Sequence, residues 1–371
     1  MQPAVSTHDL TKVFDLTTGW SFLRRRHGKK SPKTVTAVDH VNLDIHGGEF
    51  FGLVGPNGAG KTTLIKVLAT LITPTEGSAD VCGYDLLEQS REVRKSVGLV
   101  SISERSFYFR LTAYQNLYFF GSLYNIPRRI LGERIETVLS TVGLGEWGDV
   151  TYMKFSAGMQ RKLAIARGLL ADPPLLLMDE PTIGLDPGSA KRTRDLLKSM
   201  LQSAMNKTIL FTTHQMHEAD RLCDRVAIIH EGRLIACDTP RNLKRTLSEQ
   251  DFIEIKGRTG GRVEGGKPLV GPQVLDAISR VKGVSQVNPL EITQLGSGVD
   301  CLLIRVGCDD GAQALQPIIE ILMSSRFTVE DASIVEPTLE DVFIHLTEGA
   351  KEEGTKDIDK ATHVWTRYGN L

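Results

Sequence analysis

The middle of the chain alternates short apolar runs with longer segments in which apolar residues recur every three or four positions. The runs at 50–54, 78–82, 97–101, 175–178, 208–212 and 226–229 predict buried strands. The segments 61–71, 113–124, 129–142, 157–170, 189–205 and 216–222 predict helices. This alternation favours an α/β fold with a largely parallel sheet. Residues 5–14 and 35–45 alternate apolar with polar positions, as edge strands do.

The pattern changes after Pro240. Residues 252–345 predict a smaller α+β unit, with strands near 252–255 and 301–306, helices near 274–280 and 312–325, and a Gly-rich loop over 259–271. The charged end of the chain predicts a disordered tail. We therefore predict a first domain over 1–245, a second over 246–347, and a tail over 348–371.

One segment of the first domain does not fit the alternating pattern. Residues 15–34 form an insertion that combines aromatic side chains with a run of Arg and Lys. Two interpretations remain open: a solvated loop, or a segment that contacts a membrane partner or anionic lipid.

Charge and hydropathy exclude some functions. With 44 Lys and Arg against 45 Asp and Glu, the net charge of −1 argues against nucleic-acid binding driven by a positive field. No apolar run reaches the roughly 18 residues of a membrane span, and the N-terminus lacks the apolar core of a signal peptide. If the chain serves a membrane process, we expect a partner to cross the membrane.

A phosphate-binding motif stands between a predicted strand and a predicted helix. Residues 55–62, GPNGAGKT, fit the pattern G-x-x-x-x-G-K-[ST], in which backbone N–H groups surround phosphate oxygens. We expect Lys61 to reach the β- and γ-phosphates and the Thr62 hydroxyl to ligate Mg²⁺. The candidate nucleotide contacts are Gly55, Pro56, Asn57, Gly58, Ala59, Gly60, Lys61, Thr62 and Thr63.

Two carboxylates follow the apolar run at 175–178. Because side chains alternate along a strand, Asp179 can face a metal ion at the phosphate loop while Glu180 lies nearer the nucleotide. The position of Glu180 suggests that it polarises the attacking water. The two motifs together indicate a P-loop NTPase.

The residues before this strand indicate which class of P-loop NTPase the chain resembles. The segment 155–160, FSAGMQ, opens a helix with Ser156 as a good N-cap, and it resembles the LSGGQ signature. The run 155–186 resembles signature, Walker B and D-loop in that order, and His214 follows as a switch histidine. Over about residues 5–245, the chain therefore resembles the ATP-binding subunits of ABC transporters.

The resemblance implies a fold and a dimeric site. The family combines a mixed-sheet core with an antiparallel β subdomain and a helical subdomain. Two subunits face head to tail, and each ATP lies between one P-loop and the partner's signature helix. His214 would contact the γ-phosphate, and Phe14 would stack on adenine. The remaining implied nucleotide contacts are Ser156, Ala157, Gly158, Met159, Gln160 and Asp186.

The resemblance also implies partners. The segment 336–343, EPTLEDVF, resembles the small domain appended to many ABC-2-type exporter ATPases, which handle drugs, lipids, polysaccharides or ions. Together, the two resemblances imply a homodimer at the cytoplasmic face of the cell membrane, attached to integral membrane permease subunits of ABC-2 type. The alternatives are an importer motor with a regulatory domain and a non-transport ABC ATPase acting on ribosomes or DNA.

One family position departs from the pattern. The family has a Gln after the strand at 97–101, where this chain has Ser103 or Glu104. Next to it, the segment 107–124 contains eight aromatic residues. These side chains fit either the core of a helical subdomain or a groove that receives a permease helix.

Overall fold

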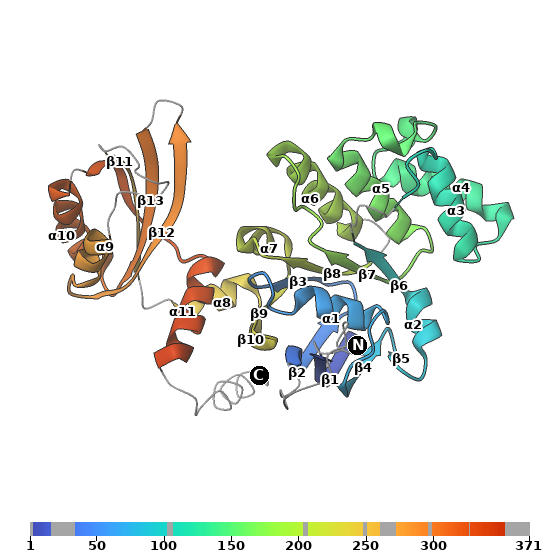
Figure 1. Ribbon diagram of the computed structural model, residues 1–371, viewed down its shortest axis with the longest axis horizontal. Coiled ribbons are helices and arrows are strands. Elements are labelled where there is room, and N and C mark those ends of the chain that lie inside the picture. Colours follow the sequence, from blue (N-terminus) through green and yellow to red (C-terminus); the bar gives the residue numbers. More distant parts are fainter. Residues whose placement is uncertain are drawn as a thin grey trace, which may run out of the picture. The chain divides into compact units, whose positions relative to one another are not determined.

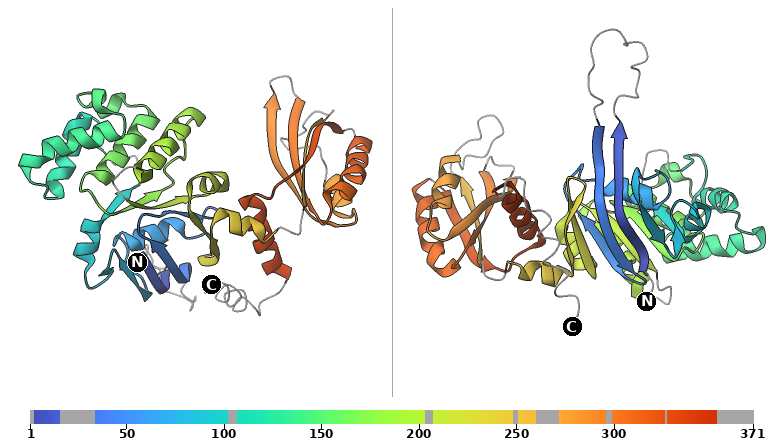
Figure 2. Two further views of the ribbon diagram at one scale, coloured as in Figure 1. Left: turned by 180° about the vertical axis from the view of Figure 1, so that it is seen from behind. Right: turned by 90° about the horizontal axis from the view of Figure 1, so that it is seen from below.

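The computed structural model describes residues 3–15, 34–101, 107–202, 207–247, 251–259, 272–295, 299–325 and 327–352 (Figures 1 and 2). The chain divides into two compact units, Met1–Pro240 with Leu346–Leu371, and Arg241–His345. The first boundary therefore lies at Pro240, and not at residue 245 as predicted. The difference is the helix α8 (Pro240–Arg245), whose polar composition does not distinguish one unit from the other.

The larger sheet of the first unit positions the site. Its strand order is β10 (Arg233–Asp238), β9 (Arg225–His230), β3 (Phe50–Val54), β8 (Thr208–Thr213), β7 (Leu175–Asp179) and β6 (Val97–Val100). All neighbours are parallel except β10 and β9. Every residue of β3 and β8 is buried, as in strands covered on both faces. The largely parallel sheet is thus confirmed, and β10 was missed because its side chains are mostly half-exposed.

A second, antiparallel sheet has the order β2 (Thr34–His46), β1 (Pro3–Asp15), β4 (Glu76–Val81) and β5 (Tyr84–Asp85). The prediction that β1 is an edge strand is wrong, because it pairs with β2 on one side and β4 on the other. Alternation of polarity does not report how many edges of a strand are paired. The helix α1 (Lys61–Leu68) shares one apolar core with both sheets, including Val5, Leu53 and Leu64.

The helices of the first unit follow the predicted pattern closely. They are α3 (Ala113–Leu123), α4 (Arg128–Thr141), α5 (Ala157–Leu169), α6 (Pro187–Gln202) and α7 (Met216–Leu222), with short 3-10 turns at Gly145–Trp147 and Tyr152–Lys154. A capping box of Thr112 and Gln115 begins α3. The helix α2 (Ser90–Ser96) was not predicted, because it buries only Val93 and so has little apolar periodicity.

The second unit is an antiparallel sheet with helices packed on it. In chain order it contains β11 (Asp251–Thr259), α9 (Pro272–Ser279), β12 (Val284–Leu295), β13 (Val299–Cys308), α10 (Gly311–Ser324) and β14 (Phe327–Val335). The strand order β12-β13-β11-β14 with this βαββαβ connectivity is the ferredoxin-like arrangement. Ile253, Ile304 and Ile318 are fully buried in its core.

The helix α11 (Leu339–Glu352) corrects the predicted tail, because residues 348–352 are helical. Glu, Lys and Ala are strong helix formers, so a charged composition alone does not indicate disorder. Thr338 starts the helix, with its N–H and hydroxyl both donating to Asp341 at 2.7 Å. Asp341 also pairs with the buried Arg305 at 3.0 Å, which gives the EPTLEDVF segment a structural role. Residues 353–371, 16–33 and 260–271 lie outside the described part.

Candidate active site

The phosphate loop turns between β3 and α1 in a conformation that needs glycine. Gly60 has a φ of 105°, and a Cβ built on it would lie 2.1 Å from the Ala37 carbonyl oxygen. A Cβ on Gly55 would lie 2.1 Å from the Ile229 carbonyl oxygen. The intervening Asn57 and Gly58 are exposed. The loop thus presents its backbone and the N-terminus of α1 to a ligand, as an anion site requires.

Lys61 lies beneath this loop with only 5% of its surface exposed. Its Nζ donates to the carbonyl oxygens of Gly55 at 2.7 Å and Pro56 at 2.9 Å. Burial lowers the pKa of the ammonium, while the nearby Glu180 and Asp179 carboxylates act in the opposite direction. The contacts hold the charge at the mouth of the loop, where phosphate oxygens can replace carbonyl oxygens as acceptors.

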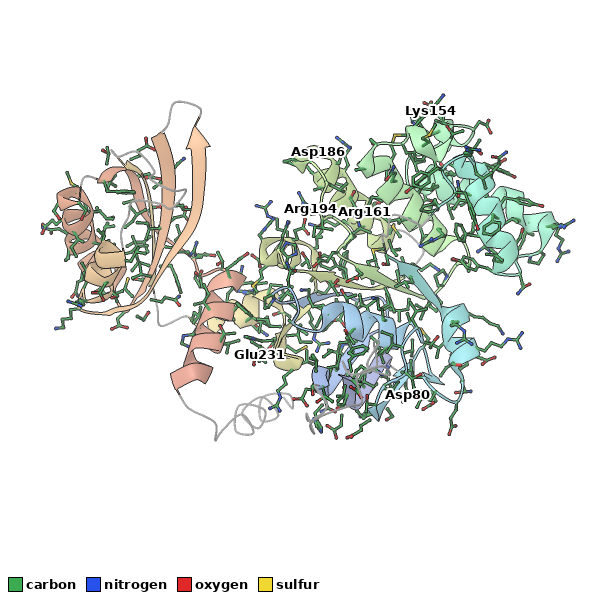
Figure 3. The ribbon with its side chains drawn as sticks, in the orientation of Figure 1. Asp80, Lys154, Arg161, Asp186, Arg194 and Glu231 are labelled. Atoms are coloured by element: carbon green, nitrogen blue, oxygen red, sulfur yellow. The ribbon has the colours of Figure 1, made fainter. Side chains whose placement is uncertain are left out.

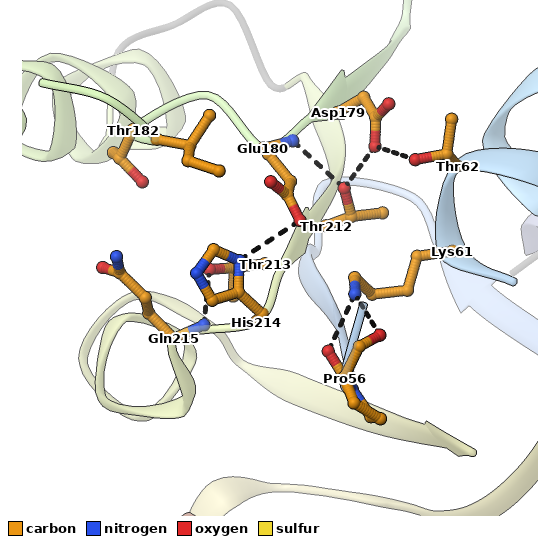
Figure 4. A network of polar contacts seen from close by, with 12 residues as sticks. Pro56, Lys61, Thr62, Asp179, Glu180, Thr182, Thr212, Thr213, His214 and Gln215 are labelled. Atoms are coloured by element: carbon orange, nitrogen blue, oxygen red, sulfur yellow. Dashed lines mark hydrogen bonds and ion pairs between the residues drawn. The ribbon is translucent and has the colours of Figure 1, made fainter. Parts of the chain in front are cut away.

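Thr62 and Asp179 meet across the site, although 117 positions separate them in the sequence. The Thr62 hydroxyl donates to Asp179 Oδ1 at 3.0 Å, and the buried Thr212 hydroxyl donates to the same oxygen at 2.8 Å (Figure 4). Two adjacent ligands of an octahedral Mg²⁺ at about 2.1 Å lie about 3 Å apart. The hydroxyl and carboxylate oxygens therefore fit a magnesium ion in type and in spacing.

Glu180 follows β7 in an unusual backbone conformation, with a φ of 47°. A non-glycine residue in the left-handed region costs about 1–3 kcal/mol and is retained where surrounding contacts impose it, often at functional sites. Here the Glu180 N–H donates to the Thr212 hydroxyl at 3.1 Å. The turn directs the carboxylate to His214, and Glu180 Oε1 lies 3.2 Å from His214 Nδ1 (Figure 4).

Of these groups, Thr62, Asp179 and Glu180 line one pocket of about 460 Å³. Its walls come from the phosphate loop, the ends of β6 and β7, and the signature helix α5: Asn57, Thr62, Ser101, Arg161, Asp179, Glu180 and Ile183. The pocket joins the predicted metal-binding side chains to Glu180. Ser103 and Glu104, which occupy the position of the family's Gln, lie outside the described residues, so the pocket wall is traced here only as far as Ser101.

The start of α5 presents its N-terminus to solvent. The Ser156 side chain caps the helix by accepting from the Met159 N–H at 3.3 Å, and the Gln160 amide donates back to the Phe155 carbonyl at 3.2 Å. Ser156 and Ala157 are exposed. A Cβ on Gly158 would lie 3.0 Å from Ser189 Oγ, so α5 approaches α6 closely there. As far as the structure describes this chain, residues 156–160 do not line its pocket.

Two further predicted contacts also lie apart from the pocket lining. Asp186 is exposed and caps α6 by accepting from the Ser189 N–H at 2.9 Å. Hydrogen bonding to the Ser189 side chain, and then to its backbone N–H, lowers the pKa of the Asp186 carboxyl group. Phe14 is half-buried near the end of β1, with the Lys12 ammonium 5.2 Å from its ring centroid. Both side chains remain accessible to a ligand or a second chain.

Arg161 is a contact that the sequence analysis missed. It is 6% exposed, and its guanidinium donates to the carbonyl oxygens of Glu180 at 3.1 Å and Ile183 at 2.7 Å. Burial lowers its pKa to about 10, so the side chain stays charged at neutral pH. The sequence signal that could have revealed Arg161 is a charged residue on the apolar face of a predicted helix. Arg161, which is labelled in Figure 3, ties the signature helix to the turn that carries Glu180.

Arg161→Met is expected to lower the free energy of unfolding by about 2–4 kcal/mol, because it removes two hydrogen bonds donated by a buried, charged guanidinium. Lys162→Met, one position along the same helix, provides the matched control and should change the stability by less than about 0.5 kcal/mol. Urea unfolding followed by circular dichroism measures both values. Equal stability of the two variants would show that the Arg161 contacts contribute nothing to folding.

Comparison with known proteins places the chain in a family. The model of the family described as ABC transporter matches residues 38–183. Over 325 residues, the chain is 32% identical to the daunorubicin resistance ATP-binding protein DrrA3 of Streptomyces coeruleorubidus, covering 87% of this chain and 93% of that protein. The chain belongs to the ABC transporter family. The predicted ABC ATPase fold and ATPase activity are confirmed by this membership.

Other ABC proteins match the first unit. The ABC transporter ATP-binding protein NatA of Bacillus subtilis is 41% identical over 229 residues, or 62% of this chain and 92% of NatA. Among solved structures, the ATP-binding cassette MJ0796, as a post-hydrolysis dimer with ADP and phosphate, matches with a TM-score of 0.53 and 25% identity, covering 63% of this chain and 98% of that one. In the described residues of this ABC ATPase, no helix is long and apolar enough to cross a membrane.

Proposed function

We propose that this ABC ATPase drives export as a homodimer, attached to separate ABC-2-type permease subunits at the cytoplasmic face of the cell membrane. One observation carries the dimer: Asn57 and Thr62 of the phosphate-binding motif and the acid pair line the pocket, while residues 156–160 at the start of α5 do not, and Ser156 and Ala157 are exposed. Each chain therefore offers two complementary half-sites. The dimeric form of the similar cassette MJ0796 supports this arrangement.

Export is supported by the extent of the similarity. The match to DrrA3 covers 325 residues, which is longer than the first unit, so it includes part of the ferredoxin-like unit. The match to NatA, at 229 residues, has the length of the first unit alone. A second unit shared with a protein named for drug resistance favours an exporter over an importer motor.

The chemistry follows from the side chains around the pocket. Residues 55–63 and the Lys61 ammonium bind the phosphates of ATP, and Phe14 stacks on adenine. Thr62 and Asp179 would hold Mg²⁺, which neutralises charge on the phosphate oxygens. Glu180 orients the attacking water and accepts its proton. His214 holds the Glu180 carboxylate and contacts the γ-phosphate.

The partner chain completes the site. The N–H groups at the start of its α5 carry partial positive charge, so Ser156, Ala157 and Gly158 bind the γ-phosphate, with Met159 and Gln160 behind them. Asp186 contacts the facing subunit. ATP thus favours the closed dimer, and hydrolysis removes that preference. The cycle transmits this difference in binding free energy to the permease.

A surface on the helical part suits a permease helix. Five aromatic side chains in α3 or next to its ends are exposed: Tyr108, Phe109, Tyr118, Phe119 and Tyr124. Tyr108 and Phe119 contact each other edge to face, with ring centroids 4.9 Å apart. An exposed aromatic cluster on a solvent-facing helix is typical of a groove that receives a partner helix. Of the other three, Phe107 is buried and Tyr114 and Phe120 are half-buried, so we propose that the core interpretation applies to these and the groove interpretation to the exposed ones.

Affinity purification tests the transporter assignment. A tagged Glu180→Gln variant is purified with ATP from detergent-solubilised membranes of the native host, and co-purifying proteins are identified by mass spectrometry. We expect a polytopic membrane protein in stoichiometric amount. The same variant purified without ATP serves as the control for non-specific recovery. Recovery with ribosomes, with DNA or alone would overturn the proposal and favour a non-transport ATPase.

A further inference from the structure

Glu218 is a fully buried carboxylate beside the active site that the chemistry above does not use. It lies on α7, with 0% of its surface exposed. Its Oε2 accepts from the Thr182 hydroxyl at 2.6 Å and lies 3.5 Å from the Thr213 hydroxyl. Its Oε1 accepts from Arg194 Nη1 at 2.6 Å.

These three partners come from three segments, two of which carry the proposed reacting groups Glu180 and His214. Thr182 lies two residues after Glu180, in the loop that continues to Asp186. Thr213 directly precedes His214 and also accepts from the Gln215 N–H at 3.0 Å (Figure 4). Arg194, labelled in Figure 3, lies on α6, the helix that Asp186 caps. A single carboxylate therefore joins the loop after Glu180, the end of β8 and α6.

A buried carboxylate is costly unless its oxygens are bonded and its charge is paired. Glu218 meets both conditions, because Arg194 pairs with it and a Thr hydroxyl donates to it. An apolar side chain of similar volume would commonly give equal or greater stability. The bonds differ from apolar packing in being directional, and they fix the oxygen positions of Thr182 and Thr213.

We propose that Glu218 is a positioning residue for ATP hydrolysis, holding the loop after Glu180 in register with His214. This inference rests on the roles proposed above for Glu180 and His214. Arg161 holds the same loop through the carbonyl oxygens of Glu180 and Ile183. With both anchors in place, the carboxylate of Glu180 stays 3.2 Å from His214 Nδ1 in spite of the positive φ of Glu180.

The most specific test removes the hydrogen bond between the Thr182 hydroxyl and Glu218 without changing the charge of either side chain. Thr182→Val keeps the shape of the side chain and deletes the hydroxyl that donates to Glu218, whereas Thr182→Ser retains the hydroxyl and is the matched control. Because a displacement of about 1 Å can slow catalysis about 10²-fold, we expect Thr182→Val to lower kcat by about 10- to 100-fold. Thr182→Ser should stay within about 3-fold of the wild type.

The same variants separate positioning from binding and from folding. The phosphate loop lies on β3 and α1, so the KM for ATP should change by less than about 3-fold while kcat falls. Glu218→Met, which deletes both acceptor oxygens, should reproduce the loss of kcat. Both assays are run on the full chain, well below the melting temperature that circular dichroism gives for each variant.

Two outcomes would overturn the inference. If Thr182→Val and Glu218→Met melt earlier but turn over ATP like the wild type, Glu218 has only a structural role. If kcat falls as far in Thr182→Ser as in Thr182→Val, the hydrogen bond from the Thr182 hydroxyl to Glu218 does not determine turnover. Glu180→Gln, assayed in parallel, distinguishes failure of the positioning role from failure of the proposed chemistry. Wild-type turnover in Glu180→Gln would show that Glu180 has no role in hydrolysis, and the inference about Glu218 would fail with it.

Discussion

Replacement of Glu180 by Gln is expected to lower kcat for ATP hydrolysis by about 10³-fold, within the range for loss of a general base. The amide has nearly the shape of the carboxylate and can still contact His214, which lies 3.2 Å away, but it cannot accept the proton of the attacking water. Lys61, Thr62 and the glycines are unchanged. ATP should therefore bind with wild-type affinity and stay unhydrolysed.

Phosphate release under saturating ATP and Mg²⁺ measures this effect, and size-exclusion chromatography with ATP reports the trapped dimer. Glu231→Gln is the matched control, because Glu231 is an exposed glutamate that also has a positive φ, 49°, in the turn between β9 and β10. It should keep turnover within about 2-fold of the wild type, as a surface substitution away from a reacting group. Turnover by Glu180→Gln within about 3-fold of the wild type would show that another group activates the water.

The candidate site divides into a part that sequence could predict and a part that it could not. The phosphate loop is local, since neighbouring residues form it and Lys61 bonds to carbonyl oxygens only five and six positions away. Asp179 and Glu180 were found because they end an apolar strand. Arg161 and Glu218 contact groups 19 to 36 positions away, through bonds that only the folded chain brings together.

The fold shows the same division. Strands covered on both faces, such as β3 and β8, are continuous apolar runs and were predicted with good bounds. The strand β14 was missed because most of its side chains are exposed or half-exposed, so its sequence carries little apolar signal. The ferredoxin-like order places β11 between β13 and β14, which no local pattern reports.

Removal of the Lys61 ammonium is expected to have the second large effect, which is a loss of ATP affinity as well as of turnover. Lys61→Met should weaken ATP binding by about 10²-fold or more, because a hydrogen bond to a charged group is worth about 1.5–3 kcal/mol and the lysine serves two phosphates. Met matches the apolar part of the buried side chain, so the fold should be retained. The buried Gly55 carbonyl oxygen and the exposed Pro56 carbonyl oxygen both lose their donor, which should cost about 1–3 kcal/mol of stability.

Lys66→Met is the matched control on the same helix, since Lys66 is exposed and lies outside the pocket lining. Titration with a fluorescent ATP analogue should give wild-type affinity for this control and little binding for Lys61→Met, with circular dichroism showing that both variants are folded at the assay temperature. Wild-type affinity in Lys61→Met would mean that backbone N–H groups and the α1 N-terminus hold the phosphates without the ammonium. Because Lys61 is bonded to the loop's own carbonyl oxygens in the ligand-free chain, its contribution to affinity is what remains after those two bonds are given up.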